Sequence, residues 1–100
     1  MVNIFEGHIA GDIPVVAEFY APWCGPSALM APVLHQIRED FGNRVAVLQI
    51  DIDRNPVLAQ RYQVQTVPTV IVFRKGQVLW RKSGVAARQE IVAHLLAPLV

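Results

Sequence analysis

The sequence has 100 residues, of which 53% are hydrophobic and 17% are charged, and its formal net charge is +1. This length predicts one domain spanning residues 1–100, and the composition excludes a disordered chain. The net charge decides little, but no basic cluster recurs along the sequence, which argues against a nucleic-acid partner. Apolar runs are interrupted within about ten residues and fall short of the ~20 residues that cross a bilayer, so we expect no membrane partner.

The N-terminal stretch MVNIFEGHIAGDIP has no basic segment and carries Glu6, His8 and Asp12 where a secretory signal would be apolar. We expect helix or coil here. If this is the complete native chain, the pattern predicts a cytoplasmic protein; a leader removed earlier would leave no trace in the sequence.

The residues from Ile13 to Ala21 form an apolar run, rich in β-branched and aromatic side chains and interrupted by Glu18, which predicts a buried strand. From Pro26 to about Phe41, apolar residues recur at spacings of three and four, which predicts an amphipathic helix. Pro32 lies inside this helix and should kink it. Gly42 is expected to end it as a left-handed cap.

A second buried strand is predicted from Arg44 to Asp53, and a strand-helix-strand unit of this length implies parallel pairing with a right-handed crossover. A short helix should follow, with Asn55 as its N-cap, Pro56 at its first position and its end near Tyr62. Asp53 is a second candidate cap for that helix.

The stretch PTVIVFRKGQVLWRKSG contains two strand patterns that meet at Lys75 and Gly76, which predicts an antiparallel hairpin. The last residues, ARQEIVAHLLAPLV, predict a closing amphipathic helix. The predicted order is therefore helix or coil, β, α, β, α, β, β, α, an α/β fold.

The only cysteine, Cys24, lies in the stretch WCGPS between the first predicted strand and the helix after it. Unpaired N–H groups and the positive end of the helix dipole stabilise a thiolate at such a position. Gly25 and Pro26 add little bulk around the sulfur, and Trp23 offers a flat apolar surface to a peptide. Cys24 is thus a candidate nucleophile; the alternative is a buried structural cysteine.

A single cysteine excludes an intramolecular disulfide and makes a cysteine-based zinc site implausible. The three histidines have no partner at a spacing typical of metal ligands. We therefore expect no metal and no cofactor.

The stretches AEFYAPWCGPSALMAPVL, IDRNP, VPT with the following GQV, and Gly84 resemble the thioredoxin family in order and spacing, from about Phe5 to the C-terminus. The resemblance implies the thioredoxin fold, a central mixed sheet flanked by helices, and a thiolate that attacks protein disulfides. Because Phe5 already aligns inside the family's first helix, the family's first strand is missing or truncated, and we expect about four strands.

The resemblance also implies roles for individual residues. Cys24 falls on the family's nucleophile, and Ser27 falls on its second, resolving cysteine. Glu18 falls on the buried acid that moves protons to and from the resolving thiol. Pro68 falls on a cis-proline that faces the nucleophile, and Val67 before it offers backbone hydrogen bonds to an extended substrate.

Two further positions depart from the family pattern. Ala28 and Gln49 stand where the family usually has lysines, so Glu18 would lack its customary cationic neighbour. Burial should then raise the pKa of Glu18 with less compensation.

Ser27 removes the second step of the family's reaction, because its hydroxyl is essentially un-ionised near neutral pH and forms no stable bond in place of a disulfide. Cys24 should therefore hold mixed disulfides until an external reductant, a small thiol or a protein like thioredoxin reductase, resolves them. Ser27 can hydrogen-bond to the Cys24 thiolate, or it can simply be a residue favoured in the first turn of a helix. Ser27 fits either a change introduced into a dithiol reductase or a native monothiol protein.

A second hypothesis is a non-catalytic module that holds an extended peptide in a groove of Trp23, Val67 and Pro68. A third is a purely structural role, with an unreactive Cys24. We expect a monomer that forms a dimer linked through Cys24 only on air oxidation.

Overall fold

The computed structural model describes residues 4–95. Its elements in chain order are α1 (Ile4–Ile9), β1 (Val15–Tyr20), α2 (Gly25–Ala28), α3 (Met30–Phe41), a 3₁₀ turn (Gly42–Arg44), β2 (Ala46–Asp51), α4 (Pro56–Arg61), β3 (Thr69–Arg74), β4 (Gln77–Ser83) and α5 (Arg88–Leu95). The predicted order is confirmed within this range. The predicted continuation of the last helix, residues 96–100, lies outside the described residues.

The strands of the described range form one four-stranded sheet in the order β2-β1-β3-β4. β1 pairs with β2 in parallel and with β3 in antiparallel orientation, and β3 and β4 form the predicted hairpin. The expected mixed sheet of about four strands is therefore confirmed. Because β1 and β3 run in opposite directions, the end of β1 and the start of β3 meet at the same end of the sheet.

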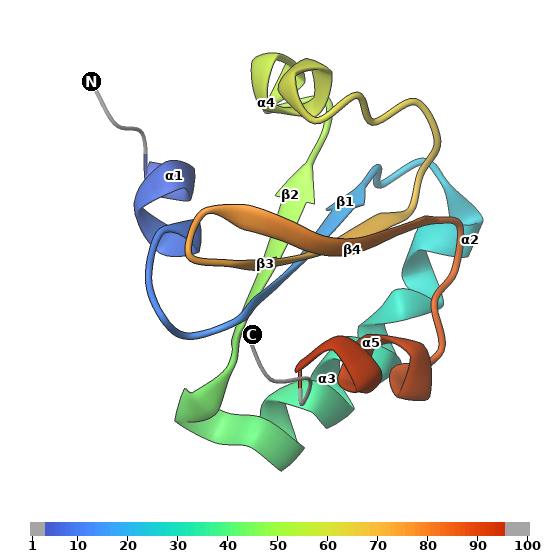
Figure 1. Ribbon diagram of the computed structural model, residues 1–100. Helices are drawn as coiled ribbons and strands as arrows, with labels where there is room; N and C mark the ends of the chain where they lie inside the picture. The colour runs from blue at the N-terminus through green and yellow to red at the C-terminus, as the bar shows by residue number, and fades with distance from the viewer. Residues whose placement is uncertain (1–3, 96–100) are drawn as a thin grey trace.

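Helices cover both faces of the sheet. Figure 1 shows α3 and α5 on one face and α1 and α4 on the other. The first face buries a cluster that includes Val16, Leu34 and Ile91, and the second buries one that includes Phe19 and Phe73. Side chains alternate along a strand, so Glu18 points to the same face as Val16, toward α3.

The expected irregularity in the long helix falls at a single residue, Leu29, whose φ of −69° and ψ of −17° stay in the right-handed helical region. The chain forms α2 and α3 with a break at Leu29 between them. Pro32 explains the position of the break, because it has no N–H to donate to the carbonyl of Ala28, four residues earlier, and its ring crowds that carbonyl. The proline therefore interrupts the helical hydrogen bonds between the short α2, which follows Cys24, and α3.

The two expected glycine positions adopt positive φ. Gly42 ends α3 with φ +52°, but its ψ of −126° lies outside the left-handed helical region, and a 3₁₀ turn follows. At the tip of the hairpin, Lys75 and Gly76 both have positive φ, at +53° and +77°. This is the geometry of a two-residue turn that matches the twist of the strands on either side.

The tip of the hairpin also contacts the N-terminal segment. The N–H of Lys75 donates to the carbonyl of Gly11 at 3.0 Å, and the N–H of Gly76 donates to the carbonyl of Ile9 at 2.7 Å. These bonds fix the far end of the hairpin to the end of α1, at the end of the sheet away from Cys24.

Candidate active site

Cys24 lies just beyond the end of β1, as the N-cap residue of α2. Its backbone is extended, with φ −97° and ψ 111°, and its carbonyl accepts a hydrogen bond from the N–H of Ser27 at 3.1 Å. The side chain is partly buried and makes no capping hydrogen bond to the helix. The thiol Sγ instead donates to the carbonyl of Val67 at 3.4 Å, 43 residues further along the chain.

The loop before β3 carries the partner of Cys24. The peptide bond between Val67 and Pro68 is cis, and the carbonyl of Pro68 accepts from the N–H of Gly84 at 2.7 Å. Thr69 is fully buried and its Oγ1 donates to the carbonyl of Thr66 at 2.6 Å. These bonds fix the loop on both sides of Val67, so the carbonyl that faces the sulfur is held in place.

Ser27 lies in α2, one turn beyond Cys24. Of the two interpretations of Ser27, the hydrogen bond from its hydroxyl to the Cys24 sulfur is not formed: Oγ is buried and has no hydrogen-bond partner within the described part of the chain. Ser27 as a whole is only 7% exposed, so its side chain is packed inside the protein. Leaving such a hydroxyl unpaired costs roughly 1–3 kcal/mol.

Glu18 is fully buried on β1, the strand that leads to Cys24, with 1% of its surface exposed. Its Oε1 accepts a hydrogen bond from Gln49 Nε2 at 3.3 Å, and its Oε2 has no hydrogen-bond partner among residues 4–95. Burial raises the pKa of Glu18, and the Gln49 amide opposes that rise without reversing it. The expected direction is confirmed: an amide gives less compensation than a cation would.

Trp23 forms the exposed side of the site. Its ring is 69% exposed, and its Nε1 donates to Asp53 Oδ2 at 2.9 Å, so an apolar surface is held open beside the cysteine. Gly25 and Pro26 are exposed as well, and the space beside Gly25 is open. The sulfur is therefore bordered by small residues on one side and by the Val67 loop on the other.

Asp53 is a site residue that the sequence interpretation missed. Asn55 is the N-cap of α4, as predicted, whereas Asp53 accepts the hydrogen bond from Trp23. The Asp53 N–H in turn donates to Asp51 Oδ1 at 2.9 Å, which stabilises the turn after β2. The hydrogen bond between Trp23 and Asp53 joins residues 30 positions apart, so no local sequence pattern predicts it.

No group of three or more His, Cys, Asp or Glu side chains in the described residues is placed to hold a metal ion. Within the same range, no helix combines the length and apolar character needed to span a membrane.

The family model named Thioredoxin matches residues 2–97. The chain belongs to the thioredoxin family. A thioredoxin-like protein of Synechocystis sp. is 39% identical over 93 residues, which cover 93% of this chain and 89% of the relative. Thioredoxin-family membership accounts for the mixed sheet, for a cysteine after β1 and for a proline before β3.

Two more comparisons extend the match. A bifunctional thioredoxin reductase/thioredoxin of Mycobacterium leprae is 34% identical over 93 residues, and this chain spans 20% of that longer protein. A solved structure titled "Structure of a malarial protein" superposes with a TM-score of 0.78 at 25% identity, over 83% of this chain and 93% of the other. Fold and relatives together support a thioredoxin-type redox function, that of an oxidoreductase acting by disulfide exchange.

Proposed function

We propose that this chain captures protein disulfides through Cys24 and, without a second cysteine, stays bound to them until an external thiol releases it. In this proposal Cys24 is the nucleophile. Ser27 occupies the position of the resolving residue, and Glu18 is the buried acid of the site. Trp23, Gly25, Pro26, Val67 and Pro68 border the bound substrate.

The observation that carries the proposal is the contact between the Cys24 sulfur and the Val67 carbonyl. In this contact a partly exposed sulfur lies beside a loop whose backbone is held by hydrogen bonds on both sides of Val67. A substrate disulfide that displaces the thiol from this carbonyl would lie along the same loop. Ser27 offers no sulfur there, and its hydroxyl is buried and unpaired.

The reaction balances without a cofactor. The Cys24 thiolate attacks one sulfur of the substrate disulfide, a bond forms between them, and the second substrate sulfur leaves as a thiolate. An external thiolate then attacks Cys24 Sγ and releases the first substrate sulfur as a thiol. A second external thiolate attacks that adduct and frees Cys24, so two external thiols become one disulfide while the substrate disulfide becomes two thiols.

The external reductant belongs to one of two classes, a small thiol such as glutathione or a reductase of the thioredoxin reductase type. The Mycobacterium leprae relative supports the second class, since its name combines a thioredoxin with a thioredoxin reductase. The lone sulfur of this chain favours the first, because a reductase that acts on an intramolecular disulfide finds none here.

Capture and turnover are measured with one disulfide-bonded test protein. The reduced chain is mixed with the test protein, and adducts are identified by mass spectrometry before and after the addition of glutathione. We expect an adduct at Cys24 that glutathione releases, and negligible turnover with thioredoxin reductase and NADPH. The Ser27→Cys variant should turn over under the same conditions and accumulate far less adduct.

The matched control is Cys24→Ser, which keeps the loop and removes the sulfur. Turnover by the unaltered chain as fast as by Ser27→Cys would contradict the proposal. So would the absence of any adduct when a small alkylating reagent still modifies Cys24.

Peptide binding without a covalent step is the second candidate, and the exposed, hydrogen-bonded ring of Trp23 favours it. Binding of a reduced, extended peptide that survives Cys24→Ser unchanged would support this candidate. Binding that is lost with the sulfur, and only under non-reducing conditions, would support covalent capture. A cytoplasmic location and a monomeric state stay predictions.

A further inference from the structure

Glu18 belongs to a row of side chains that crosses the sheet on the α3 face. In the strand register Glu18 pairs with Gln49 on β2 and with Val70 on β3, and Val70 pairs with Lys82 on β4. Neighbouring strands are about 4.8 Å apart, so the row places Lys82 two strands, or roughly 10 Å, from Glu18. Lys82 is the one cation within this row.

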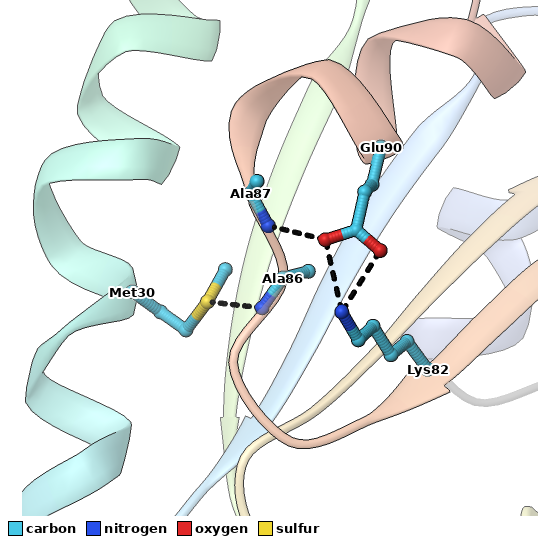
Figure 2. A network of polar contacts seen from close by, with 5 residues as sticks. All are labelled: Met30, Lys82, Ala86, Ala87 and Glu90. Carbon is cyan, nitrogen blue, oxygen red and sulfur yellow. Dashed lines mark hydrogen bonds and ion pairs between the residues drawn. The ribbon is translucent and has the colours of Figure 1, made fainter.

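Lys82 is already engaged elsewhere. Its Nζ donates to both carboxylate oxygens of Glu90 on α5, at 2.9 and 2.8 Å, as Figure 2 shows. The same carboxylate accepts the N–H of Ala87 at 2.9 Å, which fixes it at the start of that helix. The charge of Lys82 is therefore neutralised by the Glu90 carboxylate, so Lys82 does little to stabilise a negative charge on Glu18.

A different cation approaches Glu18 from the opposite edge of the sheet, through one intermediate. Arg38 on α3 donates from Nη2 to Gln49 Oε1 at 3.4 Å, and Gln49 Nε2 donates to Glu18 Oε1 at 3.3 Å. Arg38 and Gln49 are exposed, whereas Glu18 is buried. The three side chains thus form a path from solvent to the buried carboxyl.

The order of donors and acceptors along this path has a physical consequence. A carboxamide has a donor end and an acceptor end, and a guanidinium can only donate. When Arg38 bonds to the oxygen of Gln49, the NH₂ group is the end that remains for Glu18. A guanidinium bound to that oxygen also polarises the amide and strengthens the bond that its NH₂ group donates.

We propose that Arg38 is a positioning residue for the buried Glu18 carboxyl, acting through the Gln49 amide rather than by direct contact. Arg38 determines which end of the Gln49 amide faces the Glu18 carboxylate. It thereby supplies, through that amide, the positive charge that Ala28 and Gln49 themselves do not provide. This proposal about Arg38 rests on the proposed function in one respect, that it treats Glu18 as part of the active site.

The other titratable groups that face Glu18 are accounted for. Lys82 is paired with Glu90, and Asp51, next along the same face of β2, accepts the N–H of Asp53. Cys24, at the start of α2, is removed in the test below. On α3, Arg38 reaches the carboxyl only through Gln49.

The test is a double-variant cycle read out by the titration of Glu18. The variants Arg38→Met, Gln49→Leu and the double variant are made in a Cys24→Ala background, and the Glu18 side-chain carboxyl is followed by NMR against pH. Each single variant should raise the pKa of Glu18. The double variant should raise the pKa of Glu18 no further than Gln49→Leu alone, because Gln49→Leu already removes the amide through which Arg38 acts.

Two variants make the result specific. Arg54→Ala removes an exposed cation near the end of β2 that does not bond to Gln49, and should leave the Glu18 titration unchanged. Arg38→Lys keeps a donor and should restore part of the effect. An unchanged titration in Arg38→Met, or equal and additive shifts in the double variant, would overturn the proposal. Since no variant relies on the sulfur, this outcome is independent of whether Cys24 captures disulfides.

Discussion

Ser27 and Glu18 are buried polar residues that the fold leaves incompletely satisfied. Oγ of Ser27 and Oε2 of Glu18 are the buried side-chain polar atoms without a hydrogen-bond partner in the described range. Unpaired buried polar atoms are uncommon in folded proteins, and a catalytic or redox role is one explanation for them. Both lie at positions that the sequence assigned to the active site.

Replacing Ser27 by Ala should therefore stabilise the protein. The change removes a hydroxyl whose unpaired burial is unfavourable and introduces the best helix former, so we expect the free energy of unfolding to rise by about 1 kcal/mol. Urea unfolding of the reduced protein measures this. Ser83→Ala, at the exposed end of β4, is the control and should change stability by less than about 0.5 kcal/mol. Destabilisation by Ser27→Ala would show that the hydroxyl has a partner in solution.

Glu18 should make the protein less stable as the pH rises. Its pKa is higher in the folded protein than its ordinary value of 4.5, so the folded state binds more protons than the unfolded state between these two values. Stability is therefore greatest below 4.5 and falls as the pH rises through the folded pKa. Glu18→Gln, which cannot ionise, should lose this fall, and its stability relative to the unaltered protein should increase toward neutral pH. Urea unfolding at a series of pH values measures the difference; parallel profiles would contradict it.

At the scale of elements, local patterns in the sequence predicted which segments form helices and strands. The turn at Lys75 and Gly76 and the start of α4 at Pro56 rest on residue types that act within a few positions, so they could be read directly. The irregularity caused by Pro32 was predicted, but its position at Leu29 was not. A proline inside a helix can bend it or split it, and which occurs depends on the packing of both halves.

The contacts between elements were harder to predict from the sequence. Arg38 and Gln49 are 11 residues apart on different elements, and neither belongs to a recognisable motif. The unpaired state of the Ser27 hydroxyl depends on everything packed around it. The approach of Val67 to Cys24 was expected only through the family resemblance, because nothing local relates two residues 43 positions apart.

The link between β4 and α5 should respond to pH in the opposite sense to Glu18. Glu90 is the third residue of α5, and its hydrogen bonds with Lys82 and the Ala87 N–H hold its pKa below 4.5. Its contribution is complete above 4.5 and is lost as the pH falls through the lower folded pKa. Glu90→Gln should therefore lower the melting temperature at neutral pH and match the unaltered protein in strong acid. A deficit that persists in acid would assign the effect to packing.

For the whole molecule, the single sulfur determines how it can join covalently to another copy. Any disulfide-linked dimer must pass through Cys24 on both chains. Each sulfur is partly buried between the Val67 loop and the start of α2, with the large Trp23 ring beside it. Two such sites approach each other less easily than a small disulfide approaches one of them.

We therefore expect air oxidation to give a dimer slowly, and a small aromatic disulfide to modify Cys24 much faster. Non-reducing electrophoresis and mass spectrometry measure the two products, and a reductant should return both to the starting protein. Cys24→Ser should form neither. A dimer of that variant in size-exclusion chromatography, or one of the unaltered protein that persists there with reductant, would show a non-covalent interface instead.

The hydrogen bonds at the tip of the β3–β4 hairpin have a consequence for solvent exchange. An exposed two-residue turn ordinarily has backbone amide protons that swap with deuterium almost at once. Here the protons on Lys75 and Gly76 are held by carbonyls at and just after the end of α1, so they should survive as long as α1 stays docked. Their exchange rates thus give a direct measure of how often the N-terminal helix detaches, without a change of sequence.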